Sequence, residues 1–144
     1  MSATRTTYPA AIKWLHWITA LCVAVLVPVG IIMHNLESGP TRDTLYFYHK
    51  SFGILVLALT LARLAIGLIL GAPAPAAALT PFERIASLIA HRLLYVLLIV
   101  MPILGWIGVS AFDAPIDFFG LFQLPPLTAK NEESAQRIFS WLLN

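Results

Sequence analysis

The chain has 144 residues, of which 59% are hydrophobic and only 11% are charged, and its mean hydropathy is +0.83. Soluble domains carry about a quarter charged residues, so this composition excludes a soluble domain and is typical of a helical membrane protein with several spans. The formal charge of +2 is small and spread along the chain, and we therefore expect the lipid bilayer as a partner and no nucleic acid.

The first apolar run, at about 12–33, is long enough to cross a bilayer, which takes about 20 residues. Pro28 is expected to kink this helix near its far end. A cleaved signal peptide is the alternative, but no small-residue cleavage site follows the run. The polar segment 34–45 is predicted to connect this span to the next one.

The second span is predicted at about 47–70 and the third at about 87–110. Between them, the stretch from Gly71 to Pro81 is predicted to be a linker, because it is rich in alanine and proline. It ends with Thr80 as a helix N-cap and Pro81 at the first helical position, so the third helix should begin there.

Residues 111–130 are aromatic and proline-rich, too irregular to span, and are predicted to form an interfacial loop or a short re-entrant segment. A further helix is predicted at 131–144, with Asn131 as its N-cap and acidic residues in its first turn. The sequence thus predicts one domain over 1–144, an all-α membrane protein with an up-and-down bundle of three transmembrane helices and the start of a fourth helix.

The orientation of the bundle follows from the lysine and arginine residues near the ends of the spans. Five of them lie on the side of the N-terminus and four on the opposite side. This count favours a cytoplasmic N-terminus, with the segments 34–45 and 111–130 outside.

His49 and Arg63 share one face of the second span, because 14 residues come within about 40° of four whole helical turns. A charged residue inside a membrane usually faces the protein interior and has a partner there. Imidazole is a ligand of haem iron, and arginine is a natural partner for a haem propionate. His16 lies on a comparable stripe of the first helix. The two stripes are His16, Thr19, Val23, Val27 and Gly30, and His49, Phe52, Gly53, Val56, Thr60 and Arg63.

Each of these residues also has a structural interpretation. Histidines at helix ends, such as His34 and His91, are often only interfacial, and Arg63 can extend its side chain to water. The aromatic cluster of Phe118, Phe119 and Phe122 is favoured as an interfacial anchor over a quinone pocket. Spacing alone is therefore a weak signal for haem.

Short motifs spread over nearly the whole chain are more specific in their order and spacing than any one of them alone. They are Tyr8, Ile12 to Trp17, His49 to Gly53, Arg63, Ala90-His91, Leu94-Tyr95, Met101 to Trp106, Phe118 to Gly120 and Leu124-Pro125. In these motifs the chain resembles the bacterial cytochrome b561 family, which is related to the cytochrome b subunit of nickel–iron hydrogenases.

The resemblance implies a four-helix protein of the bacterial inner membrane, an electron-transfer oxidoreductase that holds two haem b groups and exchanges electrons with ubiquinone. His16 would be an axial ligand of the haem on the cytoplasmic side, and His49 of the haem on the periplasmic side. Arg63 would match the family's arginine in the second helix, and His91 a third-helix histidine near haem or quinone. Superoxide oxidation at the periplasmic face is implied for some members.

The chain departs from the family at its C-terminal end. In the family, the helix begun at Asn131 becomes the fourth span and supplies two partner histidines, which 131–144 does not contain. We expect a C-terminally truncated member, whereas His91 approaching His16 and His34 approaching His49 is the less favoured alternative. A haem-free membrane interaction or assembly subunit is the second functional hypothesis, and a homodimer or a redox partner protein stays open.

Overall fold

The computed structural model describes residues 10–70 and 80–143. Tyr8 and residues 71–79 of the predicted linker lie outside these residues, so those predictions are not tested. The described residues form four helices and two short strands: α1 (Ala10–Asn35), α2 (Pro40–Leu70), α3 (Pro81–Ala111), β1 (Ile116–Phe118), β2 (Phe122–Leu124) and α4 (Glu132–Leu143).

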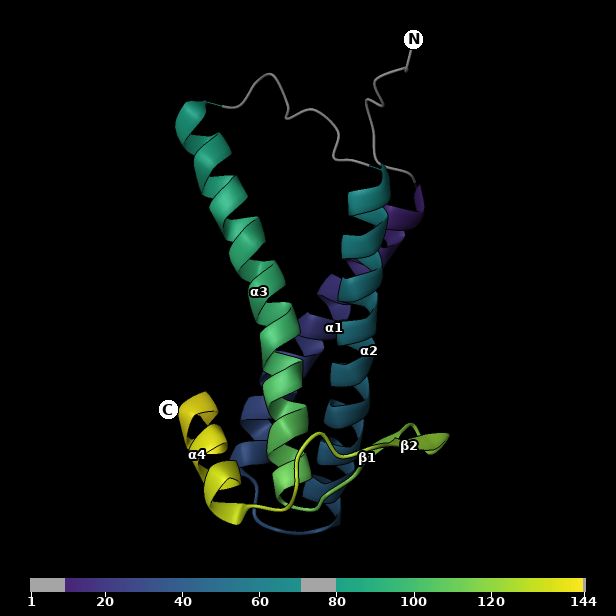
Figure 1. Ribbon diagram of the computed structural model, residues 1–144, viewed down its shortest axis with the longest axis vertical. Helices are drawn as coiled ribbons and strands as arrows, with labels where there is room; N and C mark the ends of the chain where they lie inside the picture. The colour runs from purple at the N-terminus through teal and green to yellow at the C-terminus, as the bar shows by residue number, and fades with distance from the viewer. Residues whose placement is uncertain (1–9, 71–79, 144) are drawn as a thin grey trace.

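Three of the helices, α1, α2 and α3, are long and apolar enough to cross a membrane. They run up and down in turn, with α1 beside α2 and α2 beside α3, and the short α4 packs beside the lower end of α3 (Figure 1). In the upper part of the view, α3 diverges from α1 and α2, and every residue from Pro81 to Leu94 is exposed. The fold confirms the predicted all-α membrane bundle.

The connection between α1 and α2 is shorter than the predicted segment 34–45. α1 runs through Pro28 without interruption, and α2 begins at Pro40. Proline suits the first helical position because its fixed φ is helical and its missing N–H needs no partner there. The Gly39 carbonyl accepts the first helical hydrogen bond, from the Asp43 N–H at 3.0 Å. The prediction that residues 41–45 lie outside the helix was therefore wrong.

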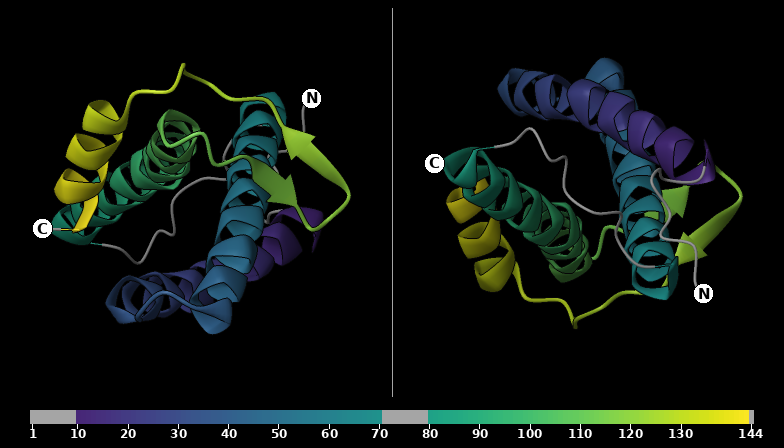
Figure 2. Two further views of the ribbon diagram at one scale, coloured as in Figure 1. Left: turned by 90° about the horizontal axis from the view of Figure 1, so that it is seen from below. Right: turned by 90° about the horizontal axis from the view of Figure 1, so that it is seen from above.

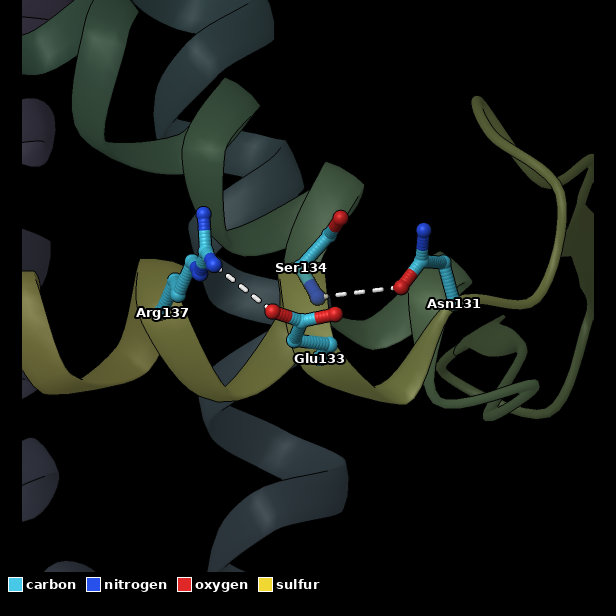
Figure 3. Close-up of polar contacts among 4 residues, drawn as sticks. All are labelled: Asn131, Glu133, Ser134 and Arg137. Carbon is cyan, nitrogen blue, oxygen red and sulfur yellow. Dashed lines mark hydrogen bonds and ion pairs between the residues drawn. The ribbon is translucent and has the colours of Figure 1, made fainter.

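Both predicted N-caps are confirmed. Thr80 Oγ1 accepts a hydrogen bond from the Glu83 N–H at 3.3 Å, and the Glu83 carboxylate accepts one from the Thr80 N–H at 2.8 Å, a capping box. At the start of α4, the Asn131 side chain accepts a hydrogen bond from the Ser134 N–H at 3.1 Å (Figure 3). These bonds satisfy N–H groups that have no partner within the first turn of a helix.

The segment 111–130 is more regular than predicted. Its strands β1 and β2 form an antiparallel hairpin in which Phe118 pairs with Phe122. Phe119 and Gly120 turn the chain with φ values of 52° and 75°, in the left-handed region. Seen from below, the hairpin lies beside α2 and α4 lies beside α3, on opposite sides of the bundle end (Figure 2).

The contact between α3 and α4 depends on small residues. Ala111 of α3 and Ala135 of α4 are almost fully buried. Phe139 of α4 stacks on Phe112, with ring centroids 5.7 Å apart, and covers Gly108. Because glycine has no side chain, the phenyl ring of Phe139 lies against the backbone of α3 at this point.

Candidate functional site

His49 projects from α2 toward α1, where its imidazole lies against Gly30. A Cβ atom at position 30 would come within 3.1 Å of the ring carbon Cε1 of His49. The ring nitrogen Nδ1 is buried and has no hydrogen-bond partner among the described residues. Gly30 therefore provides the space into which this imidazole fits, and one polar atom of the ring is left unsatisfied.

The rest of the α1–α2 contact follows from this close approach, because the two helices are antiparallel neighbours (Figure 1). Counting eleven residues away from it in opposite directions places Thr19 opposite Thr60, and both threonines are almost fully buried, with 2% and 1% of their surface exposed. Three further residues place His16 opposite Arg63, close enough for the two basic groups to repel each other. The two stripes expected from the sequence thus face each other.

Basic side chains from three helices gather at the other end of the same contact. Arg63 of α2 and His91 of α3 lie close enough to His16 of α1 for their positive charges to repel a charge on its imidazole. The Arg63 guanidinium carbon lies 5.8 Å from the centre of the Tyr95 ring, within the range of a cation–π interaction. Tyr95 follows His91 by four residues, so α3 presents both on one face.

His91 is exposed but its ring has a defined hydrogen bond. Its Nδ1 lies 2.8 Å from the backbone carbonyl oxygen of Ser87, one turn earlier in α3. A carbonyl oxygen only accepts, so Nδ1 carries the proton. In the neutral ring, Nε2 then keeps its lone pair and is the nitrogen that can accept a hydrogen bond or bind a metal.

Two further buried polar atoms lie on the inner stripe of α2. Among the described residues, neither Thr60 Oγ1 nor Arg63 Nε has a hydrogen-bond partner. Buried polar groups in proteins are nearly always paired, so these atoms call for an additional polar group between the helices. A haem propionate suits an arginine, because a carboxylate accepts charge-assisted hydrogen bonds from the guanidinium. The unpaired Arg63 Nε thus suits a haem at this end of the contact, and the unsatisfied imidazole of His49 suits a haem at the opposite end.

Other predicted residues are not part of these groups. His34 is exposed in the last turn of α1. Within the described ranges, no three histidine, cysteine, aspartate or glutamate residues lie together as they would around a metal ion. A bare metal ion needs several protein ligands close together, whereas the porphyrin supplies most ligands of haem iron. The absence of such a cluster therefore does not bear on haem. Phe118, Phe119 and Phe122 contact one another in the hairpin.

Sequence reasoning missed Tyr95 as part of the site. It appeared only within a family motif, and its contact with Arg63 joins α3 to α2. The spacing of four residues from His91 to Tyr95 is the signal that could have placed both on one face of the helix.

Replacement of Gly30 by valine is expected to destabilise the α1–α2 pair by about 1–3 kcal/mol, the usual range for overpacking a filled site. The branched side chain would overlap the His49 ring. Thermal unfolding in detergent measures the loss. Gly67→Val is the matched control, because a Cβ atom at position 67 meets nothing within 4 Å. An equal loss in both variants would contradict the close packing of His49 on α1.

Comparisons with known proteins give two matches over most of the chain. A sequence profile described as prokaryotic cytochrome b561 matches residues 7–143. The chain is also similar to "Cytochrome b561 homolog 2" of Escherichia coli (strain K12), with 31% identity over 133 residues. That alignment covers 90% of this chain and 68% of the relative.

Proposed function

Because the chain belongs to the prokaryotic cytochrome b561 family, and is thus a membrane b-type cytochrome of electron transfer, we propose that it holds two haem b groups and exchanges electrons with ubiquinone. In this proposal His16 would hold one haem and His49 the other, each through an imidazole nitrogen. The observation that carries this proposal is the imidazole of His49, half-buried between two membrane helices, with an unsatisfied nitrogen and with glycine opposite.

The second haem is proposed at the end of the bundle where three helices contribute basic side chains. Support comes from the mutual repulsion of His16, Arg63 and His91, which a propionate carboxylate would offset, and from the buried, unpaired Nε of Arg63. Arg63 would bind a propionate, and the lone pair on Nε2 of His91 suits a hydrogen bond from a bound group at the same end.

When bound, haem supplies a one-electron carrier, and the protein controls it through its own residues. His16 and His49 would hold the haem iron through a lone pair of an imidazole nitrogen, and Gly30 provides room for the His49 imidazole on the α1 side. Arg63 balances the negative charge of a propionate. The apolar side chains of α1 and α2 exclude water, which changes the relative stability of the two charge states and so tunes the potential.

Ubiquinone as the redox partner is supported by the membrane setting, because a lipid-soluble carrier reaches the helices from within the bilayer. We place the protein in the bacterial inner membrane with a cytoplasmic N-terminus, in one domain over 1–144. The exposed basic residues Lys13, Arg84 and Arg92 at the His16 end support this orientation. Superoxide oxidation at the His49 end is a finer proposal that rests on the family resemblance alone.

The difference spectrum of the purified protein tests the proposal. Protein produced in cells that make haem and extracted in mild detergent should give a sharp α band in a reduced-minus-oxidised spectrum. Addition of a soluble ubiquinone analogue to the reduced protein should then restore the oxidised spectrum. A folded but colourless preparation would overturn the proposal and favour a haem-free interaction or assembly subunit. Haem that no quinone reoxidises would overturn only the choice of electron partner.

A further inference from the structure

Ser51 connects α2 to the hairpin through a single buried hydroxyl group. The residue is fully buried, with 0% of its surface exposed. Its Oγ lies 2.9 Å from the carbonyl oxygen of Asp117 and 3.0 Å from that of Phe47, and these two oxygens share its proton. The same Oγ accepts a hydrogen bond from the Phe119 N–H at 3.1 Å. One side chain of α2 thus binds both β1, at Asp117, and the first residue after it, Phe119.

The neighbours of Ser51 contact the same part of the hairpin. Lys50 Nζ donates a hydrogen bond to the Pro115 carbonyl oxygen at 3.1 Å. The Phe52 ring meets the Phe119 ring edge-on, with centroids 5.0 Å apart. Three consecutive residues of α2, directly after His49, therefore contact the segment from Pro115 to Phe119.

The placement of His49 follows from the geometry of the α2 helical turn that carries His49, Lys50 and Ser51. Side chains leave an α-helix about 100° apart, so Lys50 and Ser51 point away from the face on which His49 meets α1. Two elements contact this helical turn of α2. On one side His49 lies against Gly30 of α1, and on the other Lys50 and Ser51 bind the hairpin. A shift of the hairpin would allow this turn, and the imidazole on it, to move.

We propose that Ser51 is a positioning residue for His49, acting through the hairpin that it holds behind the His49 turn. The consequence for a haem ligand rests on the proposed function, whereas the consequence for the imidazole itself does not. The alternative is that Ser51 only stabilises the loop, in which case its loss would loosen the hairpin and leave His49 unchanged.

The variant Ser51→Ala removes the hydroxyl and leaves the Phe119 N–H and the Asp117 carbonyl without their partner. We expect hydrogen exchange at the Phe119 amide to rise about tenfold, which corresponds to about 1.4 kcal/mol of lost hydrogen bonding. Ser51→Thr keeps a hydroxyl and should restore most of the protection. This measurement shows whether the hairpin has been released and whether the protein is otherwise folded.

Ser110→Ala is the matched control on α3. Ser110 is also buried, and its Oγ accepts a hydrogen bond from the Leu127 N–H at 3.1 Å, which holds the far end of the same loop. Its loss should raise exchange around Leu127. Because Ser110 is not on the helix of His49, its replacement should leave the His49 side unchanged.

The decisive readout is the state of His49 in the full chain purified in detergent. In haem-loaded protein, Ser51→Ala should change the low-temperature electron paramagnetic resonance signal of one of the two haems and lower its midpoint potential, because water then reaches the charged ferric form. Ser51→Thr and Ser110→Ala should leave both haems as in the wild type. A released hairpin with an unaltered haem signal would overturn the positioning role while the proposed function stands.

If the wild-type protein holds no haem, the proposed function fails and the inference is tested separately. Labelling of histidines with diethyl pyrocarbonate, read by mass spectrometry, then reports on the imidazole of His49 directly, with the exposed His34 as an internal reference. Ser51→Ala should raise labelling of His49 relative to His34 several-fold, and Ser110→Ala should not. Equal labelling in wild type and Ser51→Ala would overturn the inference.

Discussion

Replacement of His49 by alanine is expected to remove one haem per chain, and replacement of His16 by alanine the other. Alanine offers no donor atom, so each iron would lose the ligand that the described helices provide. The pyridine haemochrome assay on purified protein measures the haem content per chain. Each single variant should retain the haem of the other end, because His16 and His49 lie at opposite ends of the α1–α2 contact.

His34→Ala provides the control for the loss of a histidine as such. His34 is exposed in the last turn of α1 and lies outside both groups of site residues. Its replacement should leave the haem content and the spectrum unchanged. Protein that keeps its full colour after both His16 and His49 are replaced would contradict the assignment of the axial ligands.

Replacement of Gly108 by alanine is expected to displace α4 from α3. A Cβ atom at position 108 would lie 2.9 Å from two ring carbons of Phe139, closer than side chains normally approach. Overpacking of this kind costs about 1–3 kcal/mol. Thermal unfolding in detergent should show the loss, and limited proteolysis should cut α4 faster than in the wild type.

Gly105→Ala is the matched control for this second prediction. Gly105 lies one turn earlier in α3, and a Cβ atom there would meet nothing within 4 Å. Alanine also favours helix over glycine by about 0.5–1 kcal/mol, so this variant should be neutral or slightly more stable. A Gly108→Ala protein as stable as Gly105→Ala would show that Phe139 can move aside without cost.

The helices could be predicted from the sequence because their signals are local. Apolar runs of about 20 residues identify spans, and Thr80 and Asn131 mark helix starts through bonds made within one turn. The start of α2 was placed too late. The polar composition of residues 41–45 is typical of a connection, but charged residues are also common where a helix leaves the membrane, and Pro40 suits a first helical position.

The hairpin could not be predicted, because its stability depends on contacts distant in sequence. β1 and β2 have three residues each, too few for a pattern of alternation, and Ser51 of α2 binds β1 and the turn after it across more than 60 residues. The residues that share each helix face could be predicted, but the residues of α1 that lie opposite those of α2 could not. Helical spacing places His49 and Arg63 on one face, whereas the register that sets them opposite Gly30 and His16 comes from packing.

Residues Pro81 to Leu94 of α3 are exposed, while the contact of Tyr95 with Arg63 holds the middle of the helix and α4 holds its C-terminal end. A transmembrane helix that packs on the protein only along its C-terminal half can change its tilt in response to the surrounding bilayer. Bilayer thickness, rather than a protein core, would then set the angle of this helix. Acyl chain length in reconstituted vesicles thereby becomes an experimental control over how widely the three spans open on that side.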